Sequence, residues 1–108
     1  MTNPNSFRGE ASLPLAGSPR LLRPSFAALV AAEEELGPLF ALVERAGAGQ
    51  LKLAELVGLF WHCLESREGL SREAVGNAVI ALGLAEASKP LRVLLSQILQ
   101  GRADMPAR

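Results

Sequence analysis

The sequence is short of the side chains that carry out chemistry. It has one histidine, one cysteine and no tyrosine, and Asp104 is its only aspartate. Enzymes that move protons or form covalent intermediates hold several such groups together. His62 and Cys63 are neighbours in a segment expected to be helical, where consecutive side chains diverge by about 100°. They are therefore poorly placed to share a metal ion, and we expect no catalytic residue, no metal site and no cofactor.

The chain also lacks an excess of charge and a long apolar run. Its eleven basic and eleven acidic residues cancel, whereas nucleic-acid binding needs clustered cations that neutralise phosphates. No apolar run approaches the roughly 18 residues of a membrane span, and residues 1–10 lack the apolar segment of an export signal. A single cysteine cannot form an internal disulfide. We expect a cytoplasmic protein with no nucleic-acid or membrane partner.

Enough apolar residues are present for one core. The chain of 108 residues has the size of one domain, and 49% hydrophobic with 20% charged residues is ordinary for a globular protein. Residues 1–7 are polar and are expected to be disordered. Residues 8–101 are expected to form a single domain, and residues 102–108 a flexible tail.

The first part of this domain has the period of β-strands. Residues 8–15 alternate between polar and apolar side chains, which predicts a half-buried strand. Residues 16–19 have the composition of a turn, and residues 20–23 can return as a second strand of a hairpin. Pro14 lacks an N–H and should lie at an edge or a strand end.

The remainder has the apolar period of helices. Ser25, Ser71 and Ser88 suit helix N-termini, and glycines follow the ends of several periodic segments. The boundaries predict five helices: residues 26–36, 38–46, 53–67, 72–82 and a last helix opened by Ser88 and Pro90 that ends at residue 100. The expected fold class is mainly α (α+β), an N-terminal β-hairpin packed on a small bundle of about five short helices.

The helix expected at residues 53–67 has the widest apolar face, about 200° against the roughly 100° that a surface helix needs. It is either central to the core or presents a face to a partner. Phe60, Trp61 and Leu64 are large side chains suited to helix-in-groove binding. The competing interpretation is that they fill the core, which is favoured for Phe60 and Leu64 and evenly balanced for Trp61.

Glu33 is unusual in the helix expected at residues 26–36, because its carboxylate falls on the face made by Phe26, Leu29 and Val30. A buried carboxylate without a partner is costly. Glu33 should therefore find a cation, a backbone N–H or the edge of the core.

The nearest cations are Arg20 and Arg23 of the expected hairpin, and the favoured interpretation is an ion pair that locks the hairpin to the helix. The alternative is that Glu33 is presented to a partner protein. Glu34 and Glu35 point in other directions and are expected to form a solvated face.

The stretch from Arg8 to Gly37 resembles the opening of the small tail-assembly-chaperone-like proteins of gene transfer agents and related tailed phages and prophages. In that family an "RGE" strand, a short turn and an "L-R-P-[ST]-F" junction precede a helix with a Glu shortly before Leu-Gly. The matching elements here are Arg8-Gly9-Glu10, residues 22–26 (LRPSF), and Glu33 ahead of Leu36-Gly37. The likeness extends over about residues 8–101.

The resemblance implies a non-enzymatic tail assembly protein, a chaperone that binds the tape-measure protein before the tail tube polymerises. The implied partners are the tape-measure protein or other tail proteins, met in the cytoplasm of a bacterial host, and a homo-oligomer stays open. The candidate contacts are Glu33, Phe60, Trp61 and Leu64.

Two alternatives to the chaperone function stay open. Some members of the family are labelled tail tube proteins, so a structural component of the particle is the first alternative. A helical regulatory or DNA-binding module is the second. The neutral charge and the single arginine of residues 72–82 argue against it.

Overall fold

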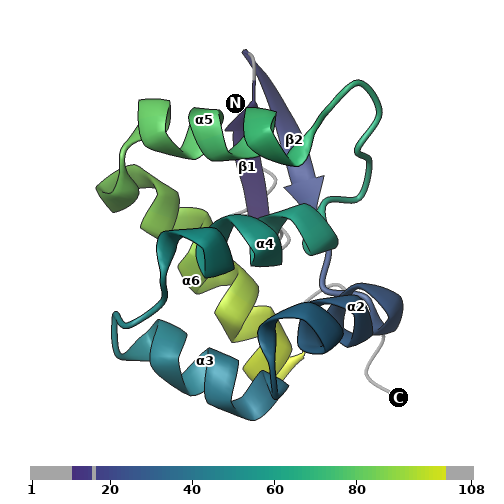
Figure 1. Ribbon diagram of the computed structural model, residues 1–108, viewed down its shortest axis with the longest axis vertical. Coiled ribbons are helices and arrows are strands. Elements are labelled where there is room, and N and C mark those ends of the chain that lie inside the picture. Colours follow the sequence, from purple (N-terminus) through teal and green to yellow (C-terminus); the bar gives the residue numbers. More distant parts are fainter. Residues whose placement is uncertain (1–10, 16, 102–108) are drawn as a thin grey trace.

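The computed structural model describes residues 11–15 and 17–101, so the expected disordered N-terminus (1–7) and flexible tail (102–108) lie outside the described residues. Within them, a two-stranded sheet is followed by five helices (Figure 1). In chain order the elements are β1 (Ala11–Leu15), β2 (Ser18–Leu22), α2 (Phe26–Leu36), α3 (Leu39–Gly47), α4 (Leu53–Cys63), α5 (Arg72–Leu82) and α6 (Leu84–Gln100). The predicted fold class is confirmed.

β1 and β2 form an antiparallel hairpin, and the alternation expected for residues 8–15 is present over residues 11–15, whereas residues 8–10 lie outside the described residues. Every second side chain of β1 is buried, starting from its first residue, whereas Pro14 is exposed. β2 begins at Ser18, so the prediction that residues 18 and 19 lie in the turn is wrong. The hairpin is tighter than the turn composition suggested, with Pro14 directly opposite Pro19.

Both prolines point away from the ladder that β1 and β2 share. The carbonyl of Leu21 accepts a hydrogen bond from Glu65 N (2.9 Å), on the side of β2 away from β1. Because alternate residues of a strand direct their backbone groups to the same side, Pro19 also faces outward, as does Pro14 opposite it. Each proline removes an N–H donor from one outer edge of the hairpin, which discourages the addition of further strands.

α4 ends at Cys63, so the prediction of a helix to Arg67 is wrong. Arg23 N donates to the carbonyl of Cys63 (2.6 Å), and Leu64 forms an isolated antiparallel bridge with Leu22. Leu64 is extended, with φ −59° and ψ 127°. The chain after α4 therefore pairs with the outer edge of β2, and these strand-like hydrogen bonds end the helix before its apolar period ends.

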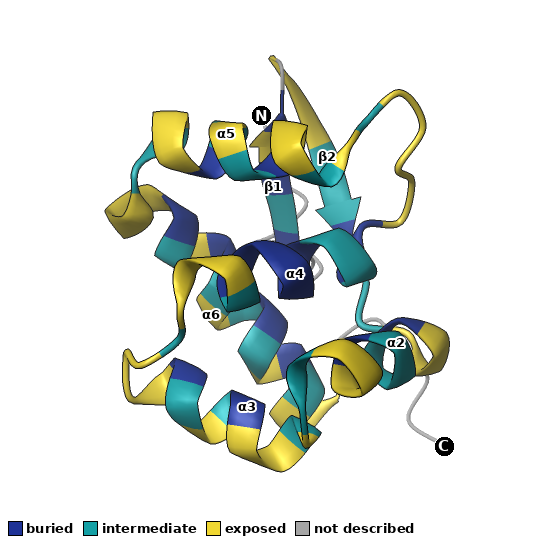
Figure 2. Ribbon diagram, viewed as in Figure 1, coloured by how far each residue is buried: buried dark blue, intermediate teal, exposed yellow. Residues whose placement is uncertain are grey.

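α4 occupies the centre of the core, as its wide apolar face suggested (Figure 2). Residues 56–60 are all buried, and α4 packs against α2 and α5. α6 packs against β1 and α5. Gly76 of α5 faces Val57, and a Cβ at this glycine would lie 3.8 Å from the Val57 side chain. A side chain of the size of alanine would therefore fit between α4 and α5.

α2 has the predicted boundaries but buries a different face. Ser25 caps it, since its Oγ accepts a hydrogen bond from Ala28 N (3.1 Å), and Gly37 ends it with a φ of 100°. The buried residues of α2 are Ala28 and Ala32, whereas Phe26 is 84% exposed. The prediction that Phe26 belongs to the core face is wrong, because the helix presents its alanines to α4 and so packs closely against it.

α6 begins at Leu84, and the predicted start at Ser88 and Pro90 is wrong. Pro90 lies inside the helix, where it lacks the N–H that would bond the carbonyl of Glu86. The helix tolerates this loss because Pro90 and Ala87 are both buried against the rest of the domain. At 17 residues α6 is the longest helix in the described part of the chain, and no helix there is long and apolar enough to cross a membrane.

Candidate functional site

Glu33 lies exposed on α2 and caps the helix that follows. Its Oε2 accepts a hydrogen bond from Leu39 N (2.9 Å), the first residue of α3. A carboxylate at this place accepts a hydrogen bond from a backbone amide that has no partner within the helix, and its negative charge interacts favourably with the positive end of the helix dipole. The predicted ion pair with Arg20 or Arg23 is wrong, because Arg20 donates to carbonyls of the loop after α4 and Arg23 pairs with Glu65.

Glu35, expected to be solvated, joins three helices. Arg72 of α5 donates to both of its carboxylate oxygens, with 2.9 Å between Nη2 and Oε1. Nε2 of His62 on α4 lies 2.7 Å from the same Oε1. The hydrogen bonds from Arg72 and then His62 lower the pKa of Glu35 to about 2. Glu35 is exposed, as predicted, but its carboxylate is paired with side chains that lie 27 and 37 positions further along the chain.

Trp61 is partly buried, whereas its predicted companions Phe60 and Leu64 lie in the core. Two guanidinium groups approach the Trp61 ring, with the Cζ atoms of Arg67 and Arg72 at 5.2 and 5.8 Å from its centroid. Both distances are within the range of a cation–π interaction. Of the three apolar side chains, Trp61 is the one that is partly accessible, and its ring lies beside two cations.

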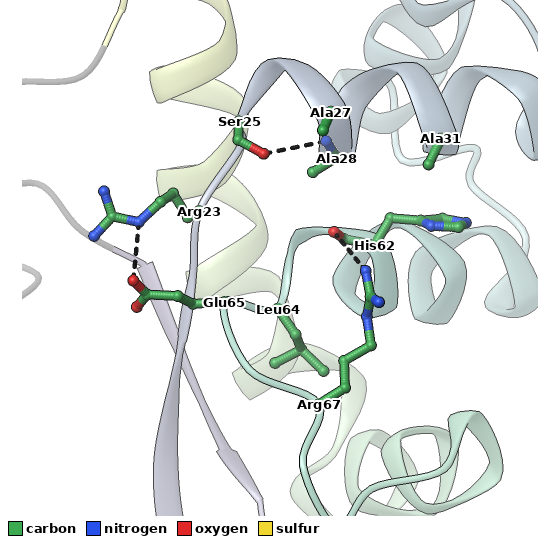
Figure 3. Close-up of a pocket in the computed structure, with 9 residues that line it drawn as sticks. All are labelled: Arg23, Ser25, Ala27, Ala28, Ala31, His62, Leu64, Glu65 and Arg67. Carbon is green, nitrogen blue, oxygen red and sulfur yellow. Dashed lines mark hydrogen bonds and ion pairs between the residues drawn. The ribbon is translucent and has the colours of Figure 1, made fainter.

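A pocket of about 300 Å³ lies between the start of α2 and the end of α4 (Figure 3). Figure 3 shows three alanines of α2 along one side, with His62 and Arg67 on the α4 side and the Arg23–Glu65 pair at the strand side. The lining residues are Arg23, Ser25, Ala27, Ala28, Ala31, His62, Leu64, Glu65 and Arg67.

The polar groups of this pocket are largely engaged with one another. Nε of Arg23 lies 3.4 Å from Oε2 of Glu65. Arg67 donates from Nε to the carbonyl of Trp61 (3.0 Å) and from Nη2 to that of His62 (3.4 Å). Arg67 thereby satisfies carbonyl groups at the end of α4 that have no partner within the helix. These contacts stabilise the helix end and the chain reversal after it.

Cys63 belongs to the core, as predicted. Burial raises the pKa of its thiol to about 12, and the thiolate is the form that attacks electrophiles and binds metals. Across the residues that the structure describes, no group of three or more His, Cys, Asp or Glu side chains could hold a metal ion.

A second hollow, of about 170 Å³, is apolar. We call it the leucine groove, and it lies where the end of α3, the start of α4 and the first half of α6 meet. Leu53 and Leu84 line it and remain 45% and 56% exposed. Its lining residues are Ala46, Gly49, Leu51, Leu53, Leu56, Leu84 and Leu91. Sequence reasoning missed this groove because it is built from three separate segments, each of which shows only an ordinary apolar period.

Large apolar side chains outside the groove are also exposed. Phe26 at the start of α2 is 84% exposed and Phe40 at the start of α3 is 90% exposed. The others are Ile80 and Leu99. Single exposed hydrophobic residues are normal in a folded protein, whereas several that lie together mark a docking surface.

Comparison with known protein families matches residues 8–101 to the family described as phage tail tube protein, GTA-gp10. The matched range contains the hairpin and all the helices of the described chain. No curated protein and no solved structure matches the sequence.

Proposed function

Because the chain belongs to the phage tail tube protein, GTA-gp10 family, we propose that this tail-associated protein is a non-enzymatic assembly chaperone. It binds the tape-measure protein before the tail tube polymerises around it. The observation that carries this proposal is the set of large apolar side chains left in solvent around a buried core, in particular Phe26, Phe40 and the exposed leucines of the leucine groove. Such surface is expected where another polypeptide docks.

The contact chemistry suits a chaperone that must release its client. Apolar contacts at a surface of this size support moderate affinity, whereas a network of buried charges would hold a partner in one fixed geometry. The ion pairs of this domain, such as Glu35 with Arg72 and Arg45 with Glu55, are internal. They hold the domain together and leave the apolar side chains for the client.

The predicted contacts Glu33, Phe60, Trp61 and Leu64 enter this proposal in two roles. Trp61 is the one that touches the client, since part of its ring is accessible. Phe60 and Leu64 support it from the core. Glu33 is accessible to a client but also caps α3, so its two roles have to be separated by experiment.

The direct test is co-expression with the tape-measure gene of the same tail cluster, in bacterial cytoplasm, where we propose that the protein acts. The expected result is that the tape-measure protein remains in the soluble fraction and co-purifies with this chain. A tape-measure protein that is equally soluble and unbound with and without this chain contradicts the proposal.

A structural component of the tail is the second candidate, and the description of the family as tail tube proteins favours it. Ring subunits of a tube need large interfaces, commonly built by strand pairing. The described part of this chain offers one hairpin with a proline on each outer edge, which is a poor platform for strand pairing. Mass spectrometry of purified particles separates the two: a stoichiometric amount supports the tube component, and absence supports the chaperone.

A further inference from the structure

We propose that the leucine groove is the docking site for one amphipathic helix of the client, carrying leucine-sized anchors flanked by aspartate or glutamate. This inference rests on the proposed chaperone function and deepens it by naming the site and the chemistry of the bound segment. It differs from the predicted contact at Trp61, which comes from the other end of α4.

The side chains that line the groove suit apolar anchors. Every lining side chain is aliphatic, apart from Gly49, which has none. Leu53 and Leu84 remain about half exposed, so a bound side chain would remove apolar area from water at both. An amphipathic helix presents such anchors at positions i, i+3, i+4 and i+7.

The groove stays open because α3 packs mainly against one other helix. The principal packing partner of α3 is α2, whereas α6 packs on β1 and α5. The start of α4, where these elements meet at the groove, is exposed at Leu53 and Ala54. Gly49, with a φ of 73° and nothing within 4 Å of a Cβ built on it, leaves further room at this end.

The charges around the groove favour an acidic partner. Two anions near the groove are already paired, Glu55 with Arg45 at 2.7 Å and Glu86 with Lys89 at 3.2 Å. Lys52 stands between two lining leucines. Its side chain forms no ion pair within the described chain.

Two further charges stand close in sequence to lining residues and make no ion pair within residues 17–101. Arg92 directly follows the lining residue Leu91. Glu44 precedes the lining residue Ala46 by two positions on α3, about 200° around the helix, so it faces away from the groove. The unpaired charges next in sequence to the groove lining, Lys52 and Arg92, are therefore positive, and acidic flanks on the docking helix complement them.

The test uses a fluorescein-labelled synthetic amphipathic peptide with leucines at helical spacing and glutamates between them, and a matched peptide with lysines instead. Binding is measured by fluorescence anisotropy with the full chain. The variants are Leu53→Gln and Leu84→Gln in the groove, Lys52→Glu at its rim, and Ile80→Gln as the control. Ile80 is 58% exposed, a fraction similar to the 56% of Leu84, and it lies on α5 outside the groove. Circular dichroism establishes that each variant is folded.

We expect the glutamate peptide to bind the wild-type chain and the Ile80→Gln variant with similar Kd. Each groove variant should raise this Kd about tenfold, the loss typical of a buried anchor at an interface. Lys52→Glu should weaken the glutamate peptide and strengthen the lysine peptide. Unchanged binding to both groove variants overturns the proposal, and so does equal affinity for the two peptides.

Two further outcomes identify which proposal has failed. If the tape-measure protein co-purifies equally with wild type and Leu84→Gln, the chaperone function stands and the groove proposal is overturned. If the peptide binds in the groove while the tape-measure protein binds nowhere on the chain, the chaperone function is overturned, and the groove is a docking site for an acidic amphipathic helix of another protein. Conversion of a dimer to a monomer by the groove variants, seen by light scattering, assigns the groove to a second copy and overturns the proposal.

Discussion

Glu35 on α2 and Arg72 on α5 form a two-pronged ion pair, in which Nη1 and Nη2 of Arg72 donate to the two carboxylate oxygens of Glu35. His62 of α4 lies against the same carboxylate, so one side chain links the three helices. Paired parallel hydrogen bonds between arginine and carboxylate are among the stronger polar contacts in proteins. Both side chains are about 40% exposed, and solvent weakens the attraction.

The ion pair should therefore contribute a modest but measurable amount of stability. We expect a double-mutant cycle with Glu35→Gln and Arg72→Ala to give a coupling energy of about 0.5–1 kcal/mol, at the upper end for exposed pairs because of the two-pronged geometry. Urea denaturation measures it. Glu34→Gln, one position away and exposed, is the matched control and should change stability very little. A coupling energy of zero would show that solvent cancels the pair.

The same contact makes stability depend on pH. The hydrogen bonds from Arg72 and His62 hold the pKa of Glu35 at about 2 in the folded protein, against an ordinary value of 4.5. Because the folded pKa is the lower one, this contribution is complete above about pH 4.5 and is lost as the pH falls toward 2. The stability difference between wild type and Glu35→Gln, measured by urea denaturation, should shrink across that window. A difference that stays constant would contradict the depressed pKa.

Glu33 should act mainly as a cap for α3. Glu33→Ala removes the acceptor of Leu39 N and should cost about 1 kcal/mol, the usual loss for an N-terminal cap. Glu33→Gln keeps an oxygen acceptor and should cost less. Hydrogen exchange at Leu39 and denaturation measure the effect, with Glu34→Ala as control. A loss of stability with intact co-purification of the tape-measure protein rejects Glu33 as a client contact.

Replacement of Gly76 with alanine should increase the stability of the protein. Alanine is the better residue inside a helix by about 1 kcal/mol, and the added methyl group would make an ordinary contact at 3.8 Å with Val57. We expect Gly76→Ala to raise the midpoint of chemical denaturation. Gly83→Ala is the opposite case, because Gly83 has a φ of 96° and any other residue would be strained there. A midpoint lowered by Gly76→Ala would mean that α4 and α5 cannot accommodate a methyl group.

Pro14 and Pro19 should limit self-association of the hairpin. Replacing both with threonine returns one outward N–H to each edge of the sheet. We expect the double variant to form more oligomer at high concentration, measured by size-exclusion chromatography with light scattering. The single variants should be intermediate. An unchanged monomer fraction would show that the side chains around the edges, and not the prolines, prevent pairing.

The features best predicted from the sequence are those that depend on only a few neighbouring residues. The caps at Ser25 and Ser71 involve a hydroxyl and an amide three positions apart, and both are present. The alternation of β1 and the ends of α2 and α5 were also correct, since each depends on a few neighbouring residues. The errors came where one local rule competed with a distant contact, as at Pro90 and at the end of α4.

The burial of the candidate contact residues was also predicted only in part. The apolar character of Phe60, Trp61 and Leu64 was evident from the helical period, but the period could not say which of them is enclosed. Leu64 leaves α4 to pair with Leu22, 42 positions earlier in the chain, and is buried by that pairing. Trp61 keeps part of its ring accessible because of where α4 sits against its neighbours.

The amino-acid order alone determined the class of fold, the helix caps at Ser25 and Ser71 and the family, because these depend on side chains within a few residues of each other and on recognisable local patterns. Tertiary structure decided that Glu35 and not Glu33 carries the ion pair, that α2 buries alanines and exposes Phe26, and that three segments enclose an apolar groove. The physical reason is that the burial of a side chain and the formation of an ion pair depend on which surfaces pack against each other. A helix with two comparable apolar faces buries the one that its neighbours leave room for.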